Sequence, residues 1–261
     1  MDLALNNKII LVTGSSKGIG FGIAKAFLEE GSTVIINGRD EKNINRAEKK
    51  LINKFNSKRV YKFLGDINTK SVLSNLYQFI EKKFQKLDHL VCNVGNGQSV
   101  SLLQENDNEF KRMLDINLMT AVNCVTKFIP MIQPSLKNED FPSITFVSSI
   151  CGVEAIGCPI AYASAKAALI SYSKNLSFPL GKKGIRVNSV SPGNIMFEGS
   201  TWDGKMKIDP IKTNQIIENN VPLRCFGSIE DIGNAVIFLA SKRAKFINGA
   251  NLIIDGGQTR T

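Results

Sequence analysis

The chain has 261 residues, of which 43% are hydrophobic and 21% charged, values that are ordinary for a globular protein. Its formal net charge is +10, but the basic run at residues 42–62 is accompanied by Glu41 and Glu48 and lacks a platform of stacking aromatic residues. This pattern argues against a nucleic-acid-binding protein, although a positive field also suits an anionic substrate or carrier. No apolar run predicts a membrane span, and the first residues do not have the pattern of an export signal.

The cysteines show no arrangement typical of a metal site. They are odd in number and include no Cys-x-x-Cys pair, and His89 is the single histidine. We therefore predict no metal site, and we expect reduced cysteines in a cytoplasmic protein. The five cysteines are Cys92, Cys124, Cys151, Cys158 and Cys225.

Apolar runs and helical spacings alternate along the chain. Residues 8–12 predict a strand, residues 21–30 a helix and residues 33–37 a second strand, which together form a βαβ unit. Further strands are predicted at 60–64, 88–92, 143–148, 185–190 and 251–254, and helices at 41–56, 70–85, 107–134, 160–180 and 230–241. This alternation predicts an α/β fold, a Rossmann-like doubly wound sheet of about seven parallel strands flanked by helices. Because no linker interrupts it, we predict one domain over residues 1–261.

Residues 194–228 break this alternation after the predicted strand at 185–190. In open α/β sheets, ligands bind beyond the carboxyl ends of the strands, so a long insertion here is a candidate substrate lid. It contains Trp202, the single tryptophan of the chain, among side chains that suit an acyl chain or a ring. The alternative is a loop with no role in binding, in which Trp202 only packs the segment itself.

A glycine-rich loop, Thr13-Gly14-x-x-x-Gly18-Ile19-Gly20, lies between the first predicted strand and helix. Glycines here allow a tight turn and the close approach of a pyrophosphate to the helix N-terminus, where free N–H groups favour anions. The spacing differs from G-x-G-x-x-G. The strand–loop–helix context therefore carries the prediction of a dinucleotide site.

The end of the second strand indicates which cofactor binds. An acidic residue there binds the ribose hydroxyls of NAD, whereas an arginine suits the 2′-phosphate of NADP. Here the strand ends in Asn37-Gly38-Arg39-Asp40. With Gly38 at the acidic position, Arg39 is placed to bind the phosphate and Lys17 adds a second cation. This favours NADP(H) over NAD(H), although an alignment shifted by one residue would put Asp40 at the acidic position.

Tyr162 and Lys166 are four residues apart in a predicted helix, so their side chains lie on one face. A lysine cation near a phenol lowers the pKa of the phenol and makes it a usable proton donor near neutral pH. Taken alone, the pair also fits a surface contact without a function. The chemical interpretation therefore depends on the cofactor that the glycine loop predicts.

Together these motifs resemble the short-chain dehydrogenase/reductase family, in its 3-oxoacyl-(acyl-carrier-protein) reductase-like form, over nearly the whole chain. Further matching segments are Asp66-Ile67, Cys92-Asn93-Val94-Gly95, Asp115-Ile116-Asn117-Leu118, Pro192-Gly193-Asn194-Ile195 and Asp255-Gly256-Gly257. The resemblance implies four catalytic residues: Asn117, Ser149 (preferred to the adjacent Ser148 on spacing), Tyr162 and Lys166. It implies cofactor contacts at Gly14, Ser16, Lys17, Gly18, Ile19, Gly20, Arg39, Asp66, Ile67, Asn93, Gly95, Tyr162, Lys166, Pro192, Gly193 and Ile195.

The resemblance also implies hydride transfer between a nicotinamide and a carbonyl or alcohol carbon. In the reductive direction, Tyr162 donates a proton to the carbonyl oxygen and Ser149 binds the same oxygen. Lys166 binds the nicotinamide ribose, and Asn117 holds a water that links Lys166 to solvent. We therefore expect a homotetrameric NADPH-dependent reductase that converts a ketone, such as a 3-oxoacyl thioester, to a secondary alcohol. The alternatives are an NAD(P)+-linked alcohol or sugar dehydrogenase and a catalytically silent cofactor-binding regulator.

Two departures from the family pattern lie near the expected site. Cys92 and Val94 stand where the family has asparagine and alanine, a change that we expect to alter packing. Phe197 replaces a threonine that in the family binds the cofactor carboxamide. We therefore expect the backbone of Ile195 to provide more of that contact.

Overall fold

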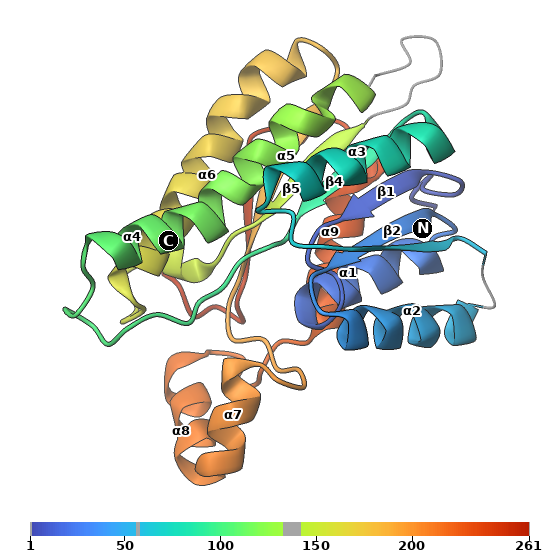
Figure 1. Cartoon of the computed structure of the whole chain (residues 1–261). Helices are drawn as coiled ribbons and strands as arrows, with labels where there is room; N and C mark the ends of the chain where they lie inside the picture. Colours follow the sequence, from blue (N-terminus) through green and yellow to red (C-terminus); the bar gives the residue numbers. More distant parts are fainter. Residues whose placement is uncertain (1, 56–57, 133–141, 261) are drawn as a thin grey trace.

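The computed structural model describes residues 2–55, 58–132 and 142–260, and its described strands form one parallel sheet (Figure 1). The strands are β1 (Ile9–Val12), β2 (Thr33–Gly38), β3 (Val60–Leu64), β4 (His89–Cys92), β5 (Ser143–Val147), β6 (Arg186–Pro192) and β7 (Asn251–Ile254). Their order is β3-β2-β1-β4-β5-β6-β7, which confirms the predicted seven-stranded parallel sheet within the described residues. The order in which successive strands are added to the sheet reverses between β1 and β4, and doubly wound sheets bind ligands at this switch point.

Helices cover both faces of the sheet (Figure 1). One face carries α1 (Gly18–Glu29), α2 (Glu41–Phe55) and α9 (Ile229–Ala240). The other carries α3 (Lys70–Phe84), α4 (Asp107–Leu114), α5 (Thr120–Phe128) and α6 (Ile160–Gly181). Strands buried on both faces need apolar side chains pointing both ways, which accounts for the near-continuous apolar runs in the sequence.

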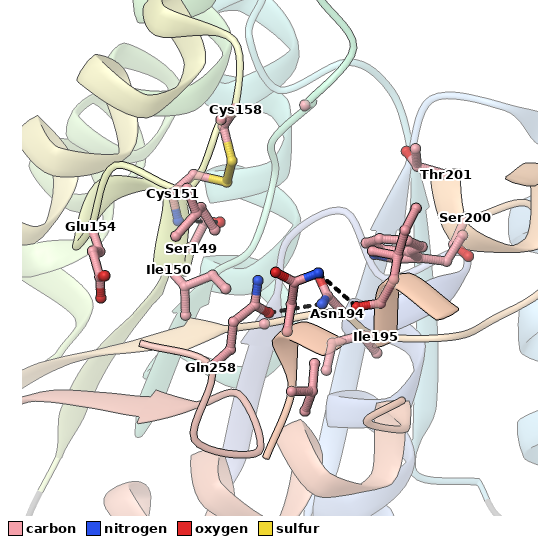
Figure 2. A pocket seen from close by; sticks show the side chains of 18 of the residues that line it. Ser149, Ile150, Cys151, Glu154, Cys158, Asn194, Ile195, Ser200, Thr201 and Gln258 are labelled. Carbon is pink, nitrogen blue, oxygen red and sulfur yellow. Dashed lines mark hydrogen bonds between the residues drawn. A yellow bond between two sulfur atoms is a disulfide. The ribbon is translucent and has the colours of Figure 1, made fainter. Parts of the chain in front are cut away.

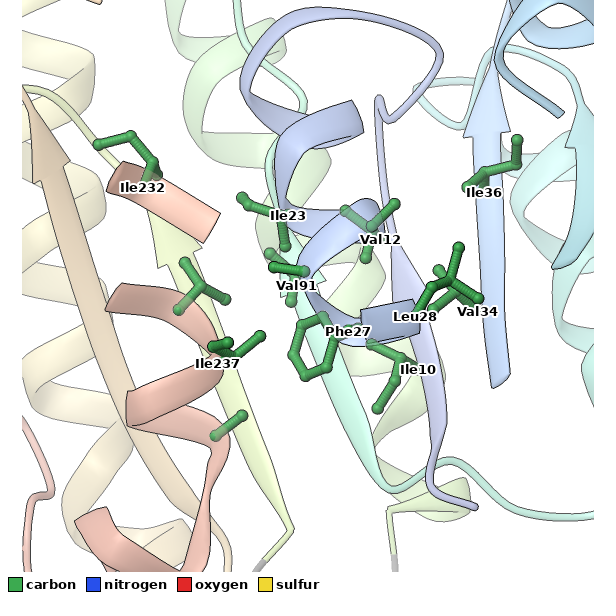
Figure 3. Packing of buried hydrophobic residues seen from close by; sticks show 14 of the residues in the cluster. Ile10, Val12, Ile23, Phe27, Leu28, Val34, Ile36, Val91, Ile232 and Ile237 are labelled. Carbon is green, nitrogen blue, oxygen red and sulfur yellow. The ribbon is translucent and has the colours of Figure 1, made fainter. Parts of the chain in front are cut away.

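Two apolar cores lie on opposite sides of the sheet, because successive strand residues face opposite sides. In β1, Ile10 and Val12 pack with α1 and α9, whereas Leu11 packs with α3, α5 and α6. Figure 3 shows the first core, where the ring of Phe27 is fully buried. A Cβ on Gly22 of α1 would lie 2.6 Å from the carbonyl oxygen of Ile229, so glycine permits the close contact of α1 with α9. This packing fixes the N-terminus of α1 beside the crevice at the ends of β1 and β4, where the strand order reverses.

Most predicted elements agree with the structure, and three differ. The helix α1 begins at Gly18 and not at residue 21, because the last turn of the glycine loop is already helical. The strand β6 continues to Pro192, where it pairs with Ile254 of β7, a contact that the fold creates and local sequence does not reveal. A π-helical turn, Asp115–Met119, divides the helix predicted at 107–134. Two of the predicted helix termini, residue 56 and residues 133–134, lie outside the described residues.

Residues 194–228, which we call the β6–α9 segment, contain α7 (Thr201–Ile208) and α8 (Pro210–Asn220). These two helices project from the layers of the sheet (Figure 1). The ends of the segment are joined at its base, where the Gly227 N–H donates to the Asn194 carbonyl (3.0 Å) and the Met196 N–H donates to the Gly227 carbonyl (2.8 Å). Among the described residues, none of the helices is long and apolar enough to cross a membrane.

Candidate active site

The glycine loop after β1 is held by side chains from the two neighbouring strands. Gly14 and Gly18 adopt φ values of 61° and 58°, in the left-handed region that favours glycine. The Asn93 amide donates to the carbonyl oxygens of Thr13 (3.1 Å) and Gly14 (2.9 Å). From the other side, Asn37 Oδ1 accepts from the Gly14 N–H at 3.3 Å. The Asn93 side chain, predicted to contact the cofactor, thus binds the loop itself.

The end of β2 has no room for an acidic side chain at residue 38. A Cβ on Gly38 would lie 2.8 Å from Ser16 Oγ, so any side chain there would displace the loop. The neighbouring Arg39 side chain is 75% exposed, and its guanidinium is 3.8 Å from the Asp66 carboxylate. These features fit a cofactor with a 2′-phosphate better than a cofactor whose ribose is bound by a carboxylate at residue 38. Of the two predicted cofactor contacts after β3, the Asp66 side chain is exposed, whereas that of Ile67 is buried in the core beside α3.

A pocket of about 330 Å³ lies between the glycine loop, α2 and the β6–α9 segment. The Glu198 carboxylate lines it and pairs with Arg46 at 3.2 Å. The ring of Phe197 lies against the first turn of α1, since a Cβ on Gly18 would be 2.6 Å from it. The departure at residue 197 therefore places an aromatic ring over the loop. The cations that line this pocket are Lys17, Arg46 and Lys50.

Lys166 is buried on α6, with 3% of its surface exposed. Its Nζ donates to the Val147 carbonyl at the end of β5 (2.9 Å), and its own carbonyl accepts from Ser148 Oγ (2.9 Å). Ser148 thus fastens α6 to β5. A Cβ on Gly95 would lie 3.0 Å from the Lys166 Nζ, so glycine makes room for the ammonium group. Burial lowers the pKa of Lys166 to about 8.

Tyr162 lies one helical turn before Lys166, and the Lys166 Nζ is 5.9 Å from the centre of its ring. Burial raises the pKa of Tyr162, and a hydrogen bond with Ser149 acts in the opposite direction. The expectation of a lowered Tyr162 pKa is therefore wrong, because the net shift is upward. The physical reason is that desolvation of the phenol is the largest effect, while the Lys166 Nζ donates to the Val147 carbonyl.

Asn117 lies in the π-helical turn between α4 and α5 and is fully buried. Its Oδ1 accepts from the Asn96 N–H (2.9 Å), and its Nδ2 donates to the carbonyl oxygens of Asn96 and Met113 (both 3.1 Å). A Cβ on Gly95 would be 2.8 Å from the Asn117 Oδ1. Asn117 therefore ties the segment after β4 to the helix and lies next to the space occupied by the Lys166 ammonium.

The main pocket, with a volume of about 910 Å³, brings Ser149 and Tyr162 together with Gly193 and Ile195. Figure 2 shows Ser149 and Ile195 among the side chains that line it. Ser148 does not line this pocket. Several polar side chains also line it: Asn194, Lys205 and Arg224 from the predicted lid, and Glu154, Gln258 and Arg260, which sequence reasoning missed. The Asn194 amide donates to Gln258 Oε1 at 2.7 Å, so β6 is tied to the C-terminal residues across the pocket. No spacing in the sequence indicates that residues so far apart meet here.

A disulfide joins Cys151 and Cys158 in the segment after Ser149 (Figure 2). The expectation that all five cysteines are reduced is therefore wrong. The turn Ile150–Gly152 folds the chain back, which brings the two Cα atoms to 6.0 Å, and a spacing of seven residues does not indicate this. Cys92, Cys124 and Cys225 are free thiols. Within the part of the chain that the structure describes, no group of three or more His, Cys, Asp or Glu side chains is placed to hold a metal ion.

Comparisons with known proteins agree with this fold. A family model described as enoyl-(acyl carrier protein) reductase matches residues 14–259. The chain is 35% identical over 257 residues to the 3-oxoacyl-[acyl-carrier-protein] reductase FabG of Chlamydia muridarum, with 98% of this chain and 99% of that protein covered. The chain therefore belongs to the short-chain dehydrogenase/reductase family, as its motifs predicted, and is an oxidoreductase.

Two of the other similar proteins are named for a steroid and a sugar. The 3alpha-hydroxysteroid dehydrogenase of Mediterraneibacter gnavus is 28% identical over 98% of both chains. The crystal structure of L-sorbose reductase from Gluconobacter frateurii, complexed with NADPH and L-sorbose, covers 100% of both chains with a TM-score of 0.90 and 28% identity. The Pseudomonas aeruginosa RhlG/NADP active-site complex covers 99% of both chains with a TM-score of 0.87 and 26% identity.

Proposed function

We propose that this protein is an NADP(H)-dependent reductase that converts a carbonyl to a secondary alcohol. One observation carries the proposal: Ser149 and Tyr162 line the same pocket, and the buried Lys166 lies one helical turn behind the tyrosine. The glycine loop, whose Ile19 lines that pocket, supplies the phosphate cradle of a dinucleotide beside it. The proposal thus has a proton donor, a hydrogen-bond donor for the oxyanion and a cofactor site side by side.

The chemistry follows from the positions of these groups. When bound, the nicotinamide supplies the hydride. The Tyr162 hydroxyl donates a proton to the carbonyl oxygen, and the Ser149 hydroxyl donates a hydrogen bond to the same oxygen and stabilises its developing negative charge. Lys166, a cation below pH 8, stabilises the resulting phenolate. Asn117 holds the backbone around the ammonium group and positions a water through which Lys166 regains protons.

The proposal of NADP(H) over NAD(H) rests on charge and on space at the end of β2. Gly38 packs against Ser16 and leaves no place for a ribose-binding carboxylate. Arg39 is exposed and Lys17 lies in the adjacent loop, so two cations are available to a 2′-phosphate. Two similar solved structures are described as complexes with NADPH or NADP. An NAD(P)+-linked dehydrogenase that runs the same reaction in reverse uses the same residues.

Two substrate classes have support. A 3-oxoacyl thioester is supported by the relative from Chlamydia muridarum, which is named a 3-oxoacyl reductase. A small ketone with several hydroxyl groups is supported by the polar walls of the pocket, where Glu154, Asn194 and Gln258 offer hydrogen-bonding groups. The resemblance to L-sorbose reductase agrees with this second class. We propose the acyl thioester first and the hydroxylated ketone as the alternative.

We further propose that the chain is one cytoplasmic domain with the β6–α9 segment as its substrate lid. The segment lines the pocket through Trp202 and Ile216 while its helices project from the sheet, as expected of a lid. A homotetramer is proposed from family resemblance, and the exposed rings of Phe178 and Phe246 are available for such contacts. Measurement of the mass in solution tests the tetramer, and a monomer would contradict it.

The test of the proposed function is a panel of carbonyl compounds with NADPH oxidation followed by absorbance. For Tyr162→Phe we expect kcat to fall at least about 100-fold, because the proton donor is lost, while NADPH binding measured by fluorescence persists. Tyr172→Phe is the matched control, since Tyr172 lies on the same helix but packs its ring against Phe146. Wild-type turnover in Tyr162→Phe would refute the mechanism. NADPH binding without turnover of any compound would favour the regulator.

A further inference from the structure

The segment from Ser149 to Tyr162 joins the two pocket hydroxyls and contains the Cys151–Cys158 disulfide (Figure 2). Both cysteines line the 910 Å³ pocket and neither is fully buried, so small thiols can reach them through the pocket. Cys92 and Cys124, in contrast, are buried in the core. The disulfide is therefore part of the wall that a substrate would touch.

The start of this segment is fixed by contacts that do not need the disulfide. Gly152 packs against α6, where a Cβ would lie 2.6 Å from the Lys166 carbonyl carbon and from the Ala167 nitrogen. The Cys151 N–H donates to Ser149 Oγ at 3.1 Å. The turn that carries the serine is therefore held to the catalytic helix.

The tip of the segment depends much more on the disulfide. Gly157 adopts a φ of 80°, and a Cβ there would meet nothing within 4 Å, so this part of the chain lies in open space. Cys158 follows it directly, and its bond to Cys151 closes the tip onto the fixed turn. Reduction of this bond would give the residues between the two cysteines more conformations and would make that wall of the pocket less ordered.

We propose that Cys151 and Cys158 are a reversible dithiol–disulfide site whose redox state sets the affinity of the pocket for its substrate. The effect on substrate rests on the reductase function proposed above. A dithiol reductant attacks one sulfur as a thiolate and forms a mixed disulfide, and the other cysteine leaves as a thiolate that takes up a proton. The second thiol of the reductant then displaces the first cysteine, which gives two cysteine thiols and the oxidised, cyclic reductant. A low-molecular-weight disulfide reverses this two-electron exchange.

A role in regulation fits the position of the pair better than a structural role. Disulfides in reducing compartments are mostly transient and redox-sensing, and accessible ones exchange more readily than buried ones. The cross-linked segment lies at the pocket and not in either apolar core, so reduction leaves the fold intact. Tyr162 and Lys166 stay in place because α6 holds them. We therefore expect reduction to change KM for the carbonyl substrate much more than kcat.

The experiment equilibrates the intact protein in buffers with graded ratios of reduced to oxidised dithiothreitol. Alkylation followed by mass spectrometry counts free thiols in each buffer, and NADPH absorbance gives kcat and KM for the best compound of the panel. On reduction we expect two additional alkylated cysteines and a rise in KM of about tenfold from the less ordered pocket wall. The NADPH dissociation constant, measured by fluorescence, is expected to stay within about twofold, because the glycine loop is braced independently.

Three variants separate the pair from other effects. Cys151→Ser and Cys158→Ser should each show the high KM of the reduced enzyme and no response to the reductant. Cys225→Ser is the matched control, because Cys225 is an exposed free thiol that does not line the pocket, and the KM of this variant should change on reduction by the same factor as that of the wild type. The proposal is overturned if the wild-type KM does not change with the number of free thiols, or if the alkylation of Cys151 and Cys158 is the same in every buffer. The thiol count needs no turnover, so a failure of the reductase function is recognised separately, by an inactive panel in every buffer.

Discussion

The main pocket has one wall built from α6 and the turn after β5, and another built from the β6–α9 segment, and the two are held by different interactions. On the first wall Lys166 and Ser149 are buried, and α6 is joined to the core strand β5 by hydrogen bonds. On the second wall α7 buries no residue, and Trp202 lies against Phe226 at its base. The groups proposed for proton transfer thus belong to the core, while the wall formed by the β6–α9 segment belongs to the periphery.

The energetics of the two walls differ accordingly. Removing one partner of a buried hydrogen bond costs about 1–3 kcal/mol, because the other partner is left unsatisfied. Exposed ion pairs such as Arg46–Glu198, with side chains 58% and 74% exposed, contribute about 0–1 kcal/mol each. We expect the first wall to open only with global unfolding and the second to open locally at much lower free energy. This suits chemistry that needs fixed groups and a substrate that must enter and leave.

The largest expected effect concerns the first wall, in the variant Lys166→Met. Turnover should fall by about 1000-fold, because both the cation beside Tyr162 and its proton supply are removed. The free energy of unfolding at pH 7 should nevertheless rise. Burial shifts the pKa of Lys166 from 10.5 to about 8, which corresponds to a penalty of about 3 kcal/mol for the buried cation, offset in part by the loss of the bond to the Val147 carbonyl. Urea titration measures this gain.

The pH dependence of the same variant gives a second check. Between pH 8 and 10.5 the unfolded chain keeps the proton of Lys166 while the folded chain has lost it, so this group makes the wild type more stable as pH rises. The stability gap between Lys166→Met and the wild type should therefore narrow above pH 8. Wild-type kcat/KM should fall over the same range, since the cation disappears. The raised pKa values of Cys92 and Cys124 affect both proteins equally. A stability gap that stays constant with pH would contradict a lowered pKa of Lys166 in the folded chain.

A smaller effect is expected at the cofactor end of the crevice, in Arg39→Gln. The dissociation constant of NADPH should rise about tenfold to 100-fold, because a charge-assisted bond to the 2′-phosphate is lost, while that of NADH should hardly change. Fluorescence titration with both cofactors measures the two constants. Lys42→Gln removes an equal charge from an exposed position nearby and serves as the control. Equal weakening of NADPH and NADH would indicate that Arg39 acts through the field of the protein and not through the phosphate.

The same contrast explains what the sequence could predict. The strand residues and the shared helix face of Tyr162 and Lys166 follow local rules, namely alternation of apolar runs and helical spacing, so the fold was within reach. The catalytic roles were implied by the family resemblance and not by these local rules. The bonds of Asn93 to the glycine loop and the meeting of Asn194 with Gln258 depend on residues far apart in the chain. The raised pKa of Tyr162 depends on burial, which spacing does not reveal. Contacts made by the assembled fold were therefore the part that could not be predicted.

The smallest expected effect tests the second wall, in Glu198→Gln, which removes the exposed contact with Arg46. The free energy of unfolding should change by less than about 1 kcal/mol, because both side chains are mostly in solvent. Substrate kinetics should change more visibly, by about twofold to threefold, because a weaker anchor shifts the opening equilibrium of the β6–α9 segment. The fluorescence of Trp202, the single tryptophan, reports that movement.

Glu48→Gln is the matched control for this last variant, because it removes a surface ion pair with Lys62 that does not touch the pocket. It should leave both the kinetics and the Trp202 signal unchanged. If Glu198→Gln destabilises the protein by several kcal/mol, the β6–α9 segment is held as firmly as α6. The difference between the two walls would then lie in their chemistry alone, and substrate entry would need a route other than the opening of this segment.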